Sequence, residues 1–399
     1  MDFYRHLFTN GGQGKAISFT LVYLISIIFT FQSLVTAYSS STYLEQFIIP
    51  QFVGLVFSAA ALLGIIITLL LPRLLRAIGN TATTVSMMLL MMLMLTIVGL
   101  APTPTFTIAA YVIYMALFPQ IYFNIDIYLE TLIGNEEGVT GGKRGLILTL
   151  MSLAAFCSPL AMGAIIGTDN NLANVYFVAA AVGFLFIALV FSRFRGFYDP
   201  KYETIRVRDL IKTAFVNKDV STVMWAQFLL QIFFTWAVVY FPLFLATVVG
   251  FDWETISKII AAGLFAFVIF EYPTGVIADK YIGEKEMMAL GFVVLALASA
   301  SISLMAGAGV IAWMALMFVS RFGASLVEVT TESYFFKQVK GHDSNLISLF
   351  RLTRPLGSLI GTLLASLSLL FLPFNLIFIV LALVMVVGAF STLRITDTK

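Results

Sequence analysis

Residues 194–219 read FRGFYDPKYETIRVRDLIKTAFVNKD, and this charged stretch divides a chain of 399 residues into two apolar halves. Within the stretch, apolar and charged residues alternate in a helical rhythm, which predicts a short helix lying on the anionic inner face of a membrane. A solvated charged linker is the alternative interpretation. On either side, apolar runs of helical length follow one another without a comparable break.

These runs predict twelve membrane-spanning helices, six on each side of the charged stretch. Ordinary soluble domains have about 25% charged residues, whereas this chain has 11% charged and 60% hydrophobic residues. Only helices and closed β-barrels span a bilayer, and the alternating pattern of barrel strands is absent from the sequence. We therefore expect an all-α membrane protein. The expected helices cover residues 16–38, 51–71, 81–101, 105–133, 144–167, 171–193, 220–249, 255–277, 286–306, 309–335, 345–371 and 374–394.

Positive charges predict how these helices are oriented. With the N-terminus in the cytoplasm, 19 of the 23 Lys and Arg residues fall in cytoplasmic segments and only Lys258 falls in an outer loop. Because Lys and Arg concentrate in cytoplasmic loops, both termini are expected inside the cell. The first helix is expected to be retained, since no small-residue cleavage site follows it. We expect an N-terminal six-helix bundle (1–193), a cytoplasmic linker (194–219) and a C-terminal six-helix bundle (220–399).

The second half repeats features of the first at a nearly constant displacement. Asp126 matches Glu328 at an offset of 202, and Gly79 matches Gly283 at an offset of 204. Matching positions spread over several helices indicate a duplication rather than a chance similarity. The two halves are thus expected to share one architecture.

The most specific motif lies between the eighth and ninth expected helices, where residues 271–285 read EYPTGVIADKYIGEK. It resembles the Gly-x-x-x-Asp-Arg/Lys-x-Gly-x-Arg/Lys signature of the major facilitator superfamily, with two residues, Tyr281 and Ile282, in place of one. The corresponding segment of the first half, residues 71–79, lacks the leading Gly and the Asp. The matching residues are Gly275, Asp279, Lys280, Gly283 and Lys285.

This resemblance implies the major facilitator fold, in which two six-helix bundles expose a central site to each side of the membrane in turn. It also implies that the five matching residues form a cytoplasmic latch. Gly283 would allow a left-handed turn, and Asp279 would accept hydrogen bonds from a helix N-terminus or pair with Arg. Residues 154–163 resemble a degenerate form of the family's antiporter motif, with small residues replacing most glycines.

Ionisable residues inside the expected helices are candidates for function, because each costs about 2.5 to 3.5 kcal/mol at mid-membrane. Arg321 and Glu328 are seven residues apart and share one face of the tenth helix. A rise of about 1.5 Å per residue brings Arg321, Glu271 and Arg354 close to the middle of the membrane. We expect a proton or substrate cavity lined by Glu271, Glu328, Arg321, Arg354, Gln227 and Gln231.

Other ionisable residues lie near the inner ends of the expected helices. For these we favour salt bridges at a cytoplasmic gate that holds the two bundles together, over a role in the cavity. They are Asp126, Glu130, Arg144, Glu332 and Arg351, in addition to the latch residues.

The sequence gives no basis for metal, redox or nucleotide chemistry. One Cys and two His are too few for a disulfide framework, a multi-Cys zinc site or an iron–sulfur cluster. Neither a phosphate-binding loop nor a Gly-x-Ser-x-Gly elbow occurs. We expect neither an enzyme nor a cofactor, and an ion gradient rather than ATP as the source of energy.

The expected function is proton-coupled efflux of a small, amphipathic organic compound from a bacterial or archaeal cell. A buried carboxylate such as Glu271 or Glu328 would exchange a proton as the cavity alternates. The protein is expected to be a multi-pass monomer of the plasma (inner) membrane. Its expected partners are the small-molecule substrate, protons and the lipid bilayer, with no nucleic acid. The alternatives are an importer or facilitator of the same fold, and a membrane scaffold or sensor that transports nothing.

Overall fold

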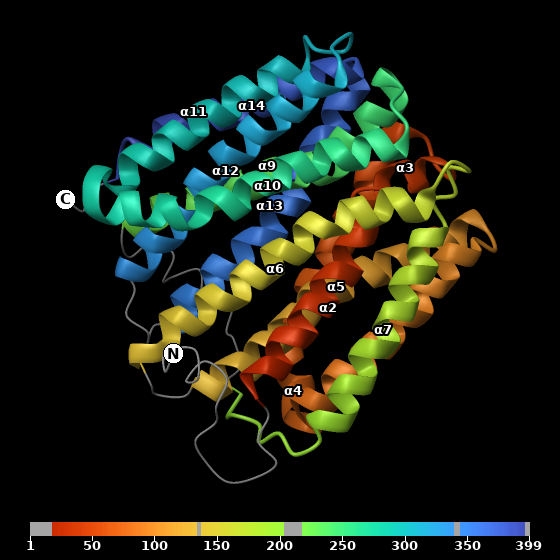
Figure 1. Ribbon diagram of the computed structural model, residues 1–399, viewed down its shortest axis with the longest axis vertical. Coiled ribbons are helices and arrows are strands. Elements are labelled where there is room, and N and C mark those ends of the chain that lie inside the picture. Colours follow the sequence, from red (N-terminus) through yellow and green to blue (C-terminus); the bar gives the residue numbers. More distant parts are fainter. Residues whose placement is uncertain (1–17, 134–136, 203–217, 339–343, 396–399) are drawn as a thin grey trace. The chain divides into compact units, whose positions relative to one another are not determined.

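The computed structural model describes residues 18–133, 137–202, 218–338 and 344–395, and these ranges fold into helices (Figure 1). Eleven of the described helices are long and apolar enough to cross a membrane. The predicted all-helical membrane class is therefore confirmed, while the twelve-helix layout and the cytoplasmic termini stay predictions. Most of the helix expected in the charged linker falls on residues 203–217, outside the described ranges.

The helices group into two compact units. Unit 1 consists of Met1–Ala37 and Leu63–Thr204, and unit 2 of Tyr38–Leu62 and Ile205–Lys399. The expected bundle boundaries at residues 193 and 220 stay predictions. The observed grouping adds a feature that was not expected, because residues 38–62 pack with helices from the C-terminal half.

Unit 1 is built around α2 (Phe19–Ala37), which packs against α5 (Pro104–Ile133), α6 (Glu137–Ile166) and α7 (Asn174–Arg193). The fully buried Phe29 of α2 contacts rings from two of these helices. Its centroid lies 4.7 Å from that of Tyr122 on α5 and 5.8 Å from that of Phe186 on α7. An aromatic core thus joins three helices that are far apart in sequence.

The element α4 (Pro50–Leu100) has 51 residues, which would extend about 77 Å as one helix, against about 30 Å for a bilayer core. Gly79 interrupts it with φ 77° and ψ 167°, so α4 consists of two helices. This agrees with two separate expected spans. The first helix nevertheless continues beyond its expected end at residue 71, through Pro72 as far as Gly79.

Unit 2 is centred on α12 (Val310–Gln338), which packs against α9 (Lys218–Phe244), α10 (Trp253–Ile277) and α11 (Glu284–Ile302). Figure 1 shows these helices side by side. α13 (Ser344–Phe371) packs against α9, and α14 (Phe374–Thr392) against α9 and α11. The short helix α3 (Ser40–Glu45) and the π-helical turns η1 (Leu245–Val249) and η2 (Ala278–Ile282) were not expected.

Close polar contacts explain why residues 38–62 belong to unit 2. The Ser58 Oγ lies 2.6 Å from the Thr362 Oγ1 of α13. Gly54 lies so close to α9 and α13 that a Cβ there would be 2.0 Å from the Tyr240 hydroxyl and 2.2 Å from the Ser366 Oγ. Only glycine fits at this position.

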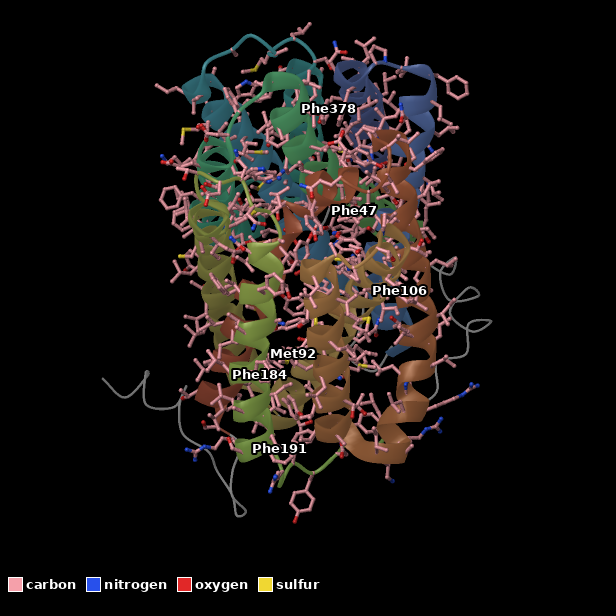
Figure 2. The ribbon with its side chains drawn as sticks, turned by 90° about the vertical axis from the view of Figure 1, so that its right-hand side faces the viewer. Phe47, Met92, Phe106, Phe184, Phe191 and Phe378 are labelled. Atoms are coloured by element: carbon pink, nitrogen blue, oxygen red, sulfur yellow. The ribbon has the colours of Figure 1, made fainter. Side chains whose placement is uncertain are left out.

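Large apolar side chains cover much of the outside of the helices. Figure 2 labels Phe184 and Phe191, which are seven residues apart on one face of α7 and are 66% and 51% exposed. Such a surface suits lipid contact rather than contact with water. The functional candidates must therefore be sought among the few polar groups inside each unit.

Candidate functional site

Two carboxylates of α12 share one guanidinium of α13. The Arg354 Nη2 donates to the Glu332 Oε1 at 2.9 Å and lies 3.8 Å from the Glu328 Oε1. Glu328 and Glu332 are four residues apart, so both point from the same face of α12. Their exposed fractions, 26% for Glu328 and 37% for Glu332, mark a partly accessible group.

Several acidic side chains gather around the Arg354 guanidinium. Two carboxylates face one guanidinium, and Glu271 of α10 adds a further repulsive charge that acts on Glu328. Like charges that share a site favour protonation of one of them. The group therefore brings acidic side chains of α10 and α12 close to one guanidinium of α13. We refer to Glu271, Glu328, Glu332 and Arg354 as the carboxylate group.

Arg321 lies apart from the carboxylate group, although it was expected to join it. It is 2% exposed, and its guanidinium interacts with the hydroxyl of Tyr38 and lies over the ring of Phe233, 5.4 Å from the centroid. Seven residues of helix separate it from Glu328, a rise of about 10 Å. Arg321 makes no ion pair with the described carboxylates.

The two expected glutamines of α9 lie in the interior of unit 2. The fully buried Gln227 accepts a hydrogen bond from the Thr331 Oγ1 of α12 at 3.0 Å, while its Nε2 has no partner among the described groups. Gln231, one turn further along, is half-buried and packs against Gly357 of α13. The carbonyl of Gln231 accepts from the Thr235 hydroxyl at 2.8 Å. The Gln227–Thr331 hydrogen bond thus ties α9 to α12, and Gln231 packs on α13.

The latch motif adopts an unusual turn. A Cβ on Gly275 would lie 3.6 Å from the Val329 Cγ1, an ordinary contact, and Gly283 has φ 104°. Between them, η2 is a π-helical turn closed by the Gly283 amide, which donates to the Ala278 carbonyl at 3.2 Å. A π-helical turn holds one residue more than an α-helical turn, and the motif has one residue more than the family signature.

The side chains of some expected gate residues lie outside the described part of the structure. These are Asp279 and Lys280 of the latch, and Arg144 on α6. The others are described: Lys285 and Asp126 are half-buried, whereas Glu130 and Arg351 are exposed. Their role at a gate stays a prediction.

Two charged residues near the corner glycines were missed in the sequence. Glu284, directly after Gly283, is 1% exposed, contacts the Lys337 Nζ and accepts from the Ser333 hydroxyl at 3.2 Å. Asp199 accepts from the Asn80 amide at 2.7 Å, directly after Gly79. The position of Glu284 beside Gly283 was the available signal, whereas Asp199 had none, because its partner Asn80 is 119 residues away in the chain.

Unit 1 has a polar interior without buried charge among its described residues. The Gln120 Nε2 donates to the Gly64 carbonyl at 3.0 Å, and the Tyr122 hydroxyl donates to Thr30 at 3.0 Å. Both amide atoms of the fully buried Gln32 and of Asn124 lack a partner among the described groups. These amides could form hydrogen bonds with a neutral ligand.

Comparisons with known proteins agree with this architecture. Residues 223–399 match the family described as Major Facilitator Superfamily. In fold, the chain is similar to the crystal structure of the nucleoside transporter NupG, with a TM-score of 0.69 and 13% sequence identity, over 94% of this chain and 98% of that one. No curated protein matches the chain in sequence.

Proposed function

We propose that this chain is a transporter of the Major Facilitator Superfamily, which its C-terminal half matches and whose fold it shares, and that it couples the movement of a small organic solute to the movement of protons. The family and the fold support membrane transport by a multi-pass protein. The carboxylate group supports the coupling, and it is the observation on which the proposal chiefly rests. Efflux is our preferred direction, because residues 154–163 of α6 resemble the antiporter stretch.

The coupling is supported by the acidic side chains that gather beside Arg354. With Glu328 protonated, the Glu332 carboxylate keeps the Arg354 guanidinium as its partner. With both ionised, two carboxylates share that guanidinium, which favours access to water. A change in the access of water to this group would then change its proton occupancy. The negative charge of Glu271 would increase the difference in proton occupancy between the water-accessible and the closed state.

The proposal includes the layout expected from the sequence. Twelve helices form two six-helix bundles with cytoplasmic termini, in the plasma membrane of a prokaryote, and the protein acts as a monomer. The repeated corner supports the duplication behind this layout, because Gly79 and Gly283 both have positive φ, 77° and 104°. The latch residues and Asp126, Glu130, Arg144 and Arg351 act at the cytoplasmic gate.

An importer or facilitator is the second candidate. Its support is the similarity in fold to a nucleoside transporter, together with the unpartnered amides of Gln32 and Asn124, which suit a neutral solute rich in hydrogen-bonding groups. A scaffold or sensor that transports nothing is the third, and it leaves the carboxylate group without a purpose.

Proton movement in liposomes tests the coupling. The full-length protein is reconstituted with the pH dye pyranine inside, and a lipophilic amine, a lipophilic carboxylate and uridine are added in turn. We expect at least one solute to change the internal pH with the wild type, and Glu328→Gln and Glu271→Gln to abolish this response. Glu254→Gln is the matched control, because Glu254 is exposed and pairs with Lys258 at 2.7 Å, away from the carboxylate group.

Each candidate gives a different outcome. Solute-driven proton movement that persists in the Glu271→Gln, Glu328→Gln double variant contradicts the proposed coupling. Solute counterflow that continues after the pH gradient is collapsed, with no proton movement, supports the facilitator. Absence of transport for every solute, with folded protein in the liposomes, supports the scaffold or sensor.

A further inference from the structure

A charged side chain inside unit 2 has no counter-ion among the described residues. Arg321 is 2% exposed, and its guanidinium interacts with the Tyr38 hydroxyl and lies over the Phe233 ring. Its Nη1 is buried and has no hydrogen-bond partner among the described groups. A guanidinium has five donors in a planar fork, so neutral groups satisfy only part of it.

The contrast with Arg354 shows what is missing at Arg321. Arg354 is 53% exposed, where a charge is inexpensive, and it has two carboxylates within 3.8 Å. Arg321 is almost fully buried, where an ionised group costs several kcal/mol, and the described carboxylates are all beyond ion-pair distance. An uncompensated buried charge of this kind is most often retained for a function.

The groups around Arg321 come from several segments of unit 2. Tyr38 precedes α3, Phe233 belongs to α9, and Gly263 belongs to α10. A Cβ on Gly263 would lie 3.2 Å from the Arg321 Cγ and 2.4 Å from the Met317 Cγ, so the absence of a side chain there makes room for the arginine. Tyr38, Phe233 and Gly263 carry no charge, so these neighbours give Arg321 an aromatic and apolar surrounding.

We propose that Arg321 binds the carboxylate of an apolar organic anion, and that this anion is the solute class of the transport proposed above, on which the inference rests. The planar fork matches a carboxylate with two parallel hydrogen bonds. Phe233 and Met317 contact the apolar body. Protein atoms cover Nη1 in this conformation, so the anion reaches it when Tyr38, which occupies part of the fork, moves away.

Thermal unfolding of the purified full-length protein tests the site. The probes are benzoate, 3-phenylpropionate and octanoate, each paired with its neutral amide, and inorganic phosphate. A ligand that binds only the folded protein raises Tm. We expect at least one carboxylate to raise Tm of the wild type and its amide to have no effect. In Arg321→Gln, binding should weaken at least about 30-fold, as for one lost partner of a buried charge pair.

Two further variants separate binding from structure. Lys258→Gln removes an exposed positive charge from α10 and should leave the shift unchanged. Tyr38→Phe removes the competing hydroxyl and should preserve or strengthen carboxylate binding. The inference is overturned if no carboxylate raises Tm, if the amides act equally, if phosphate alone acts, or if Arg321→Gln keeps the full shift.

The experiments distinguish a failure of the anion site from a failure of the proposed coupled transport. Carboxylate binding through Arg321 without solute-driven proton movement would retain the anion site and reject the coupled transporter. Proton movement that requires Glu328, driven by an amine or uridine, without carboxylate binding would retain the transporter and reject the anion site.

Discussion

The two units place different chemistry at matching positions of the repeat. The residue after the corner glycine is Asn80 in unit 1 and Glu284 in unit 2, and both are buried. At an offset of 202, the buried Arg321 of unit 2 corresponds to Pro119 of unit 1. At these positions unit 1 therefore has neutral groups where unit 2 has charged ones.

This difference indicates a division of roles within a duplicated fold. Neutral amides and hydroxyls inside unit 1 can be satisfied by neighbouring helices at little cost. Charged groups inside unit 2 require a counter-ion, a proton or an ionic ligand. Among the described residues, fully buried charge thus occurs in unit 2, and exchanging charge between the buried positions of the units should have opposite consequences in each.

The largest effect is expected from placing a charge inside unit 1. Gln32→Glu puts a carboxylate where both amide atoms are fully buried without partners among the described groups. The free energy of unfolding should fall by about 3 to 5 kcal/mol, the cost of an uncompensated buried charge. Thermal unfolding in nanodiscs measures it. Glu328→Gln in unit 2, where a charge is removed, should change stability far less, and equal losses in both variants would contradict the division of roles.

An intermediate effect is expected at the repeated corner. Gly79→Ala and Gly283→Ala force a side chain into a backbone region that is essentially restricted to glycine, at a cost of about 1 to 3 kcal/mol. Gly79→Ala should be the more damaging, because its Cβ would lie 2.5 Å from the Asp199 Oδ2. Unfolding temperatures of both variants are compared with Gly196→Ala, where nothing lies within 4 Å. A Gly283→Ala variant with an unchanged unfolding temperature would show that the two corners are not equivalent.

The smallest effect is expected at a helix start. Asp252 caps α10 in unit 2 by accepting from the Thr255 amide at 2.7 Å, whereas Ala173 before α7 in unit 1 makes no side-chain cap. That hydrogen bond lowers the pKa of Asp252. Asp252→Ala should cost about 1 kcal/mol at neutral pH.

The pH dependence of this effect has a defined sign. Because the folded-state pKa is lowered, the contribution of Asp252 is present above the unfolded-state pKa of about 3.9. It is lost as the pH falls through the folded-state pKa. Stability curves of wild type and Asp252→Ala should therefore converge in acid, and a gap that stays constant down to the lowest pH would contradict an ionic cap.

Apolar periodicity was sufficient to predict most of the helices. The expected span 105–133 corresponds to α5 (Pro104–Ile133), and 255–277 to α10 (Trp253–Ile277). Burial in lipid requires long apolar runs with internal hydrogen bonds, so such segments are visible in one sequence. The short helix α3 was not predicted, because a segment of six residues is too short to show a helical period.

The site was predictable only in part, since periodicity gives the face of a helix and not its partner. Glu328 and Arg321 share a face of α12 as expected, but a separation along the axis gives them different neighbours. The contact between Arg321 and Tyr38 joins residues from opposite halves of the chain. Contacts of this kind depend on how the helices assemble, which local sequence does not encode.

The wide turn η2 bears on how the motif in this chain relates to its family. It accommodates Tyr281 and Ile282 between Ala278 and the corner at Gly283 without disturbing the packing of Ala278 on Met287 and Leu326. An insertion in a transmembrane protein would ordinarily rotate everything downstream by about 100°. Here the π-helical turn takes up the additional residue before α11 begins at Glu284. Motif searches with fixed spacing will overlook relatives that differ in the same way.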